Sequence, residues 1–479
     1  MIMDYKIYKN SFILATLRVI EPIISMAVII AISRVMGPES IGAYVFLIAF
    51  TSMFGTVSQM GLHALLVREV ARNKERASIY LSSSIFIGIG TSTIIIIVMN
   101  ASKGYFNLNP EINHCLLLLS FSLLPGFAVN TFDSIFMAFE RADLIFYGQL
   151  TSTIIRVGVS LIAIWAGGGI FHLALIILFS GILTLILCIF MFKSYISKIT
   201  YRVDFRISLD LMRNSWTFLL ITVVSMVSAR IDVLMLTRLT DMTQVALYSA
   251  AHKLFEMTMI LPQAYFRSTF PELSRLSHSD SYSFRNMSKD MLRYTAFYIL
   301  LAIPVILVVA PLIVDLLYGG KFSSSSKILQ VLIIGLIPWG GARIFANILV
   351  TSNLQRYDLI SGVFATAVNV VLNLILIPAF GGLGAAVALS CSLSSFCVLE
   401  FWYVRKVVNN LEITKILMWP LVGGSFVVLF TFVAKMGWVF AFLEIAVVTL
   451  GISIYFRKNG NCKRTIQNQI IILKSVIKS

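Results

Sequence analysis

The sequence predicts an all-α polytopic membrane protein, and its composition is the first observation that predicts this class. Of its 479 residues, 58% are hydrophobic and only 13% are charged. A soluble globular protein carries about 25% charged residues, and the mean hydropathy of this chain is +0.90. The second observation is a series of apolar runs of about 20 residues, each long enough to cross a bilayer as a helix.

We expect fourteen such helices, with twelve as the main alternative. A polar and basic stretch at residues 193–213 separates the first six runs from the next six, which predicts two six-helix lobes around a central cleft. The chain then divides into an N-terminal lobe (1–200), a C-terminal lobe (201–410), and two extra spans with a basic tail (411–479). The spans are expected at 11–35, 41–66, 79–99, 115–138, 145–166, 171–192, 214–238, 244–268, 291–317, 327–351, 357–378, 383–406, 413–434 and 437–456.

The distribution of basic residues predicts the orientation. Lysine and arginine number 38 against 22 acidic residues, and most of them fall in loops that would lie on the same side of the membrane as the N-terminus. The positive-inside rule therefore places both termini in the cytoplasm. Because the surplus lies in short loops between spans, it does not indicate nucleic-acid binding.

No motif for a metal or nucleotide is found. The five cysteines are scattered without a C-x-x-C pair, and no G-x-x-x-x-G-K-[ST] phosphate loop occurs, so ATP hydrolysis by this chain is not expected. We expect no cofactor, no metal site and no enzymatic activity. If the chain moves a solute across the membrane, a proton, sodium or the membrane potential is the candidate driving force.

The first expected span carries two ions within its apolar run, Arg18 and Glu21. An ion at this depth is costly unless it faces water or an opposite charge. Their spacing of three places both on one helical face, so a mutually neutralised pair that joins helices is one interpretation. A functional site is the other, and the residues alone leave both open.

The stretch that follows carries a series of recognisable motifs: Met36-Gly37-Pro38-Glu39, Gly42, Tyr44, Gly61-Leu62 and Arg68-Glu69-Val70-Ala71-Arg72. With these residues it resembles the opening of bacterial polysaccharide flippases of the multidrug/oligosaccharidyl-lipid/polysaccharide exporter superfamily. The resemblance implies that undecaprenyl-pyrophosphate-linked oligosaccharide repeat units, of the O-antigen or capsule type, move from the inner to the outer leaflet of the bacterial cytoplasmic membrane by alternating access.

Basic residues inside several spans suit such a substrate, because arginine and lysine are the phosphate-binding side chains. In the span at 244–268, Lys253 and Glu256 share one helical face with Ser249, His252 and Gln263. This stripe predicts either a polar helix interface or the wall of a cleft. The expected substrate-binding residues are Arg18, Lys253, Arg230 and Arg343.

Two acidic residues, Glu21 and Glu256, are the candidates for ion coupling, because a carboxyl group in a partly dry cavity can carry a proton. The other acids near span ends are expected at the membrane interface: Asp133, Asp315, Glu400 and Glu444. The expected partners are a lipid-linked oligosaccharide, membrane lipids and other membrane proteins of polysaccharide assembly.

Two other functions are kept as alternatives. A cation-coupled multidrug antiporter of the same superfamily would need a cleft dominated by carboxylates and aromatic rings, whereas basic residues here equal or outnumber the interior acids. A membrane-embedded polysaccharide polymerase would need a long outer loop, and the longest expected one is at residues 100–114. Both alternatives are therefore disfavoured.

Overall fold

The computed structural model describes residues 2–106, 108–196 and 202–407, and within these ranges the chain forms helices and no strand. The first helices are α1 (Ile2–Val35), α2 (Pro38–Ser58), α3 (Leu62–Arg72), α4 (Ala77–Ser102), α5 (Pro110–Ser120), α6 (Leu123–Ala138), α7 (Ala142–Trp165) and α8 (Ile170–Tyr195). They are followed by α9 (Phe205–Leu239), α10 (Met242–Thr258), α11 (Ile260–Ser279), α12 (Ser281–Tyr318), α13 (Ser323–Ile334), α14 (Leu336–Thr351), α15 (Gln355–Phe380) and α16 (Gly382–Val407).

The helical fold predicted from the sequence is confirmed. Each expected span before residue 407 coincides with one long helix or with two consecutive helices, and nine stretches of the described chain are long and apolar enough to cross a membrane. The expected spans at 11–35, 214–238 and 244–268 are not among those nine but are helical, in α1, α9 and α10–α11. The spans at 413–434 and 437–456 lie outside the described residues, so a total of fourteen stays a prediction.

Four of the expected spans are broken into two helices, and three of these breaks have a common cause. The pairs α5–α6, α10–α11 and α13–α14 each have a proline as the third residue of the second helix: Pro125, Pro262 and Pro338. A proline at this position cannot donate to the carbonyl group four residues earlier, and its ring pushes that carbonyl away. The carbonyl released before Pro262, on Thr258, instead accepts a hydrogen bond from the Tyr298 hydroxyl.

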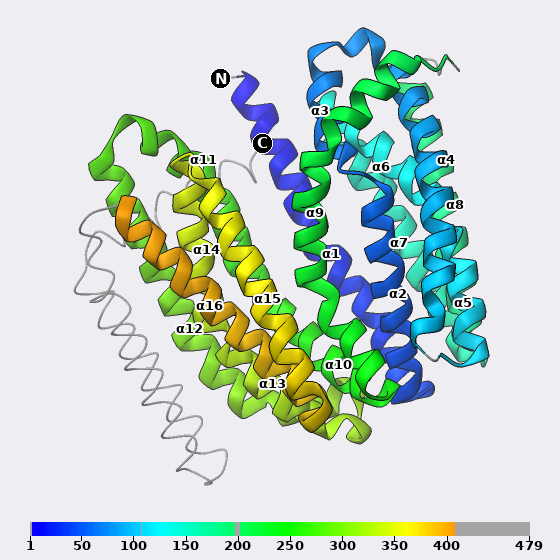
Figure 1. Ribbon diagram of the computed structural model, residues 1–479, viewed down its shortest axis with the longest axis vertical. Helices are drawn as coiled ribbons and strands as arrows, with labels where there is room; N and C mark the ends of the chain where they lie inside the picture. The colour runs from blue at the N-terminus through cyan, green and yellow to red at the C-terminus, as the bar shows by residue number, and fades with distance from the viewer. Residues whose placement is uncertain (1, 107, 197–201, 408–479) are drawn as a thin grey trace.

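The helices form two groups, α1–α8 and α10–α16, with α9 running between them (Figure 1). On one side α9 contacts α2 and α3, and on the other it contacts α15. At the upper end in Figure 1, which holds α3 and α11, the two groups are spread apart. We call this the open end. At the closed end, the α1–α2, α9–α10 and α12–α13 turns come together. The division at residues 200 and 201 stays a prediction.

The closed end is held by a close crossing of α2 and α10. A Cβ atom added to Gly42 would lie 1.9 Å from the carbonyl oxygen of Met242, so only glycine permits this approach. Beside the crossing, the guanidinium group of Arg34 at the end of α1 donates to the main-chain carbonyl groups of Leu316 and Leu317 at the end of α12. Both contacts join the two groups of helices directly.

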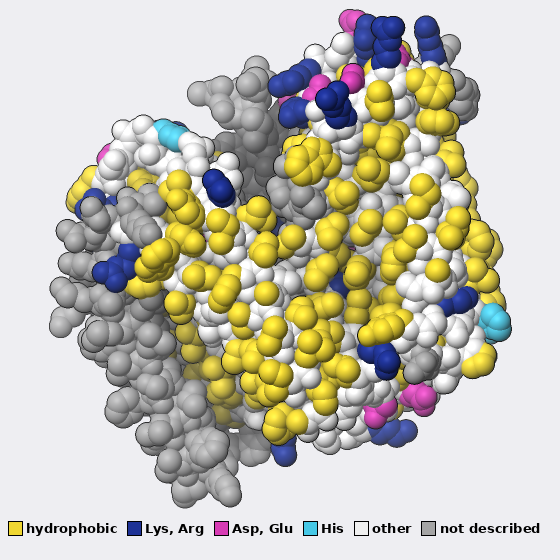
Figure 2. All heavy atoms as spheres, viewed as in Figure 1, with side chains coloured by type: hydrophobic (Ala, Val, Ile, Leu, Met, Phe, Trp, Pro, Cys, Tyr) yellow, Lys and Arg dark blue, Asp and Glu magenta, His cyan; other side chains and the backbone are white. Residues whose placement is uncertain are grey.

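On the face that Figure 2 shows, the described surface of both groups is largely apolar between the two ends. Many large apolar side chains of the bundle are uncovered, for example Ile94 (62% exposed), Ile162 (71%) and Phe190 (66%) on α4, α7 and α8. The lysine, arginine and acidic side chains in the same view gather mainly at the two ends of the molecule. This distribution fits hydrocarbon around the sides and water at the ends, and the chain is a multi-pass membrane protein.

Candidate functional site

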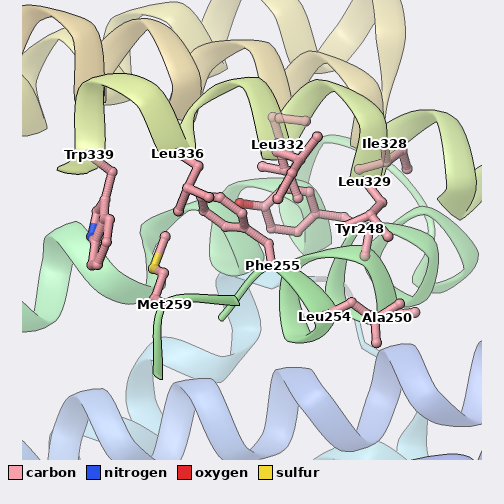
Figure 3. Packing of buried hydrophobic residues seen from close by; sticks show 14 of the residues in the cluster. Tyr248, Ala250, Leu254, Phe255, Met259, Ile328, Leu329, Leu332, Leu336 and Trp339 are labelled. Carbon is pink, nitrogen blue, oxygen red and sulfur yellow. The ribbon is translucent and has the colours of Figure 1, made fainter. Parts of the chain in front are cut away.

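The candidate site is built on α10, which is packed on two of its sides. Tyr248 and Phe255 point toward α13 and α14, where they meet Leu329, Leu332 and Leu336 (Figure 3). Ala250 and Leu254 point the opposite way, toward the blue N-terminal helices, on the side where α10 crosses α2. The remaining face of α10 carries the polar stripe seen in the sequence.

Three ionisable side chains of that face, together with Arg230 of α9, form a group that we call the α10 charge cluster: Arg230, His252, Lys253 and Glu256. The Lys253 ammonium nitrogen lies 3.3 Å from Oε2 of Glu256, and Nδ1 of His252 lies 3.7 Å from Oε1 of the same carboxylate. Arg230 of α9 interacts electrostatically with Glu256 as well. The side chains of His252 and Lys253 are each 23% exposed and that of Glu256 is 39% exposed. One accessible carboxylate therefore has three positive or protonatable neighbours.

A second ion pair lies on the N-terminal side. Glu21 of α1 is 3.8 Å from the Arg156 guanidinium group of α7, which is also 3.5 Å from the Ser25 hydroxyl. Tyr44 of α2 lies within electrostatic range of Arg156. Arg156 falls within the expected span at 145–166 but is not among the predicted site residues, because its partner lies 135 residues away and only the fold brings them together.

Behind the α10 charge cluster lies a buried polar network that sequence reasoning missed. The Asp232 carboxylate accepts a hydrogen bond from the Tyr248 hydroxyl at 2.7 Å and another from the Asn373 amide at 2.6 Å. Asn373 also donates to Oδ1 of Asn369 at 3.0 Å, and the Tyr248 ring stacks on His252. Oxygen atoms of this kind are what hard cations such as sodium bind. Two asparagines four residues apart in an apolar span were the available signal.

Removing the hydroxyl group of Tyr248 is expected to destabilise the protein. In Tyr248→Phe, the buried Asp232 carboxylate loses one of its two donors, which should cost about 1–3 kcal/mol. The matched control is Tyr318→Phe, because Tyr318 is equally buried at 1% but its hydroxyl makes only a long contact of 3.4 Å to the Ala250 carbonyl. Thermal unfolding in detergent measures the stability of both variants. An equal loss of stability in Tyr248→Phe and Tyr318→Phe would contradict a stabilising role for the hydrogen bond to Asp232.

The predicted substrate-binding residues have different outcomes. Lys253 and Arg230 share the α10 charge cluster. The side chain of Arg18 lies outside the described residues, although its backbone belongs to α1. Arg343 is exposed on α14 and interacts electrostatically with Asp358 of α15, and no described contact joins it to the cluster. Their roles in binding stay predictions.

Two acids expected at the membrane interface are buried by neighbouring helices. Asp133 is 6% exposed and accepts a hydrogen bond of 2.7 Å from the Gln149 amide, which covers it from α7. Glu400 is completely buried in α16, near Asp358. The sequence did not predict this burial, because distance from a helix end does not show which neighbouring helix covers a side chain; the interfacial depth of both acids stays a prediction. Glu444 lies outside the described residues.

The fold and the site together define a helical membrane transporter, in which two groups of helices join at one end and each group carries an ion pair inside an expected span, Glu21–Arg156 in the first and Lys253–Glu256 in the second. Comparison with known proteins specifies the family. The profile of the polysaccharide biosynthesis protein family matches residues 7–277, and that of the lipid II flippase MurJ matches residues 144–462. The chain belongs to the polysaccharide biosynthesis protein family, within the flippases of the MOP superfamily. It is a transporter and not an enzyme.

Individual relatives agree with this assignment. A putative O-antigen transporter of Shigella flexneri is 21% identical over 80% of this chain and 93% of its own length. A solved structure of the lipid II flippase MurJ in an inward closed conformation has a TM-score of 0.76 at 18% identity, covering 93% of this chain and 98% of that one. An inward-facing multidrug resistance MATE transporter gives 0.70 at 16% identity, covering 82% and 96%. The resemblance seen in the first two spans is thus confirmed.

Proposed function

We propose that this protein moves undecaprenyl-pyrophosphate-linked oligosaccharide repeat units from the inner to the outer leaflet of the bacterial cytoplasmic membrane. The observation that carries the proposal is the α10 charge cluster, in which cationic side chains outnumber the single carboxylate while remaining accessible. Moving a bare pyrophosphate through hydrocarbon is prohibitive, and a basic, hydrated site between the lobes replaces its lost solvation. The O-antigen and lipid II relatives support this substrate class.

The open end is proposed to face the cytoplasm, with both chain termini on that side. Arg68, Arg72, Lys74 and Arg76 lie at this end, on α3 and the turn after it, as the positive-inside rule requires. In this arrangement the diphosphate enters from the cytoplasm while the prenyl chain stays in lipid. Separation of α2 from α10 at the closed end then exposes the head group on the other side.

The membrane potential, negative inside, favours outward movement of an anion by about 2.3 kcal/mol per charge per 100 mV. A proton or sodium ion can add to this driving force. Glu21 and Glu256 are the proposed proton-coupling residues, and the Asp232 network offers oxygen ligands for a cation.

A reconstituted flipping assay with a defined lipid-linked glycan tests the proposal, under imposed potential and pH gradients. Wild type is expected to flip the lipid, and Arg18→Glu is expected to lose most of this activity because the charge at the proposed entry is reversed. If Arg18→Glu flipped the lipid as fast as wild type, the cationic pathway would be contradicted, although the transporter fold would still stand.

The multidrug antiporter remains the second candidate because of the structural similarity to MATE transporters. Export of cationic dyes by proteoliposomes separates the two functions. Robust dye export that survives both Arg18→Ala and Lys253→Ala would favour the antiporter.

A further inference from the structure

We propose that Glu256 is an internal counter-anion: its carboxylate occupies the cationic groups of the α10 charge cluster when no substrate is bound, and the diphosphate of the substrate displaces it. The inference rests on the proposed function and adds a mechanism for release. It starts from an asymmetry in the cluster, since all three of its other members, Arg230, His252 and Lys253, interact with this one carboxylate.

The geometry is that of a loosely held ion. The contacts of Glu256 with Lys253 and His252 are 3.3 and 3.7 Å long, longer than the 2.7–2.9 Å typical of a well-formed charged hydrogen bond. The carboxylate is also the most exposed of the three side chains, at 39% against 23% for each partner. A displaced Glu256 side chain therefore has exposed space into which it can move.

The surroundings fix the helix that carries the cluster. Tyr248 stacks on the His252 ring and is itself fixed by Asp232, while the buried side chains of Leu254 and Phe255 anchor α10 next to Lys253. Because α10 is fixed in this way, the cluster can exchange anions by side-chain movement alone, without rearranging the helix. When the diphosphate leaves, Glu256 reoccupies its partners, so that the empty site does not hold uncompensated positive charge.

Competition from Glu256 weakens the binding of the diphosphate and speeds its release. A transporter needs this competition, because a site of several cations without a competing anion would retain a diphosphate. Replacing the carboxylate by an amide should therefore have opposite effects on two quantities, the affinity for a diphosphate and the rate of turnover. A purely structural ion pair would not separate them in this way.

The test measures binding of farnesyl diphosphate to the full-length protein in detergent by calorimetry. Glu256→Gln is expected to bind roughly tenfold more tightly than wild type, which corresponds to about 1.4 kcal/mol, while its flipping rate at saturating lipid-linked glycan falls several-fold. The matched control is Glu272→Gln, which removes a carboxylate from an exposed pair with Arg275 of the same i,i+3 spacing, outside the site. The control should leave both quantities unchanged.

A second variant covers the case in which Glu256→Gln does not fold. Glu256→Asp keeps the charge but shortens its reach, and should bind farnesyl diphosphate more tightly than wild type and less tightly than Glu256→Gln. Equal or weaker binding by whichever variant folds would overturn the counter-anion role. If wild type itself neither binds farnesyl diphosphate nor flips lipid-linked glycans, the proposed function fails instead. If wild type binds farnesyl diphosphate and flips lipid-linked glycans, but neither variant binds farnesyl diphosphate more tightly, only the counter-anion role is lost and the proposed function stands.

Discussion

Replacing Lys253 with glutamate is expected to reduce the rate of flipping at least a hundredfold. The change removes a cation that would contact the diphosphate, a contact worth about 1.5–3 kcal/mol, and adds a negative charge beside Glu256, 3.3 Å from the former ammonium group. The measurement is initial flipping rate in proteoliposomes at matched protein density. Lys253→Arg should retain most activity, because it keeps the charge.

Two controls separate substrate binding from folding. Lys321→Glu makes the same charge change at an exposed position in the turn after α12 and should flip normally. The double variant Lys253→Glu/Glu256→Lys keeps an ion pair of the same spacing on α10 but moves the cation by one helical turn. Full recovery in the double variant would show that the pair is only structural and would exclude Lys253 as a diphosphate ligand.

Gly42→Ala should have the other large effect, and through a different cause. The new methyl group would lie 1.9 Å from the Met242 carbonyl oxygen, deep inside contact distance, and the obstacle is backbone that cannot rotate away. Overpacking of this kind costs about 1–3 kcal/mol. Because the clash exists only when α2 and α10 meet, the variant should favour separation of the closed end and slow flipping roughly tenfold.

Spin labels at Glu39→Cys and Thr243→Cys, in a background without the five native cysteines, report the distance across this crossing by pulsed electron resonance. The distance distribution should shift to longer values in Gly42→Ala. The control is Gly90→Ala on α4, where an added Cβ meets no atom within 4 Å. An unchanged distribution in Gly42→Ala would mean that α2 and α10 already stand apart in the membrane.

The sequence predicted the fold well because long apolar runs report helices directly. Three of these apolar runs also contain the residue at which the helix breaks, Pro125, Pro262 or Pro338. The sequence alone could not show whether such a proline produces a kink or begins a new helix. The polar stripe of α10 was visible for the same reason, since Lys253 and Glu256 lie one turn apart on a single helix.

What the sequence did not reveal depends on contacts between helices distant in the chain. Arg156 falls inside the expected span at 145–166, but its pairing with Glu21 required α1 and α7 to be placed side by side. Likewise, Asp232 and Asn373 belong to α9 and α15 and meet only in the folded bundle. Burial of Asp133 followed from Gln149 on a neighbouring helix, and hydropathy carries no information about such a neighbour.

The contact of Arg34 at the closed end has an evolutionary consequence. Its guanidinium group binds the main-chain oxygens of Leu316 and Leu317 rather than their side chains, and every amino acid presents the same carbonyl group. Mutations that exchange either leucine for another residue compatible with a helix end therefore leave the acceptor intact. Related sequences can drift at the receiving positions while one arginine preserves the junction, so covariation between the two partners would not reveal it.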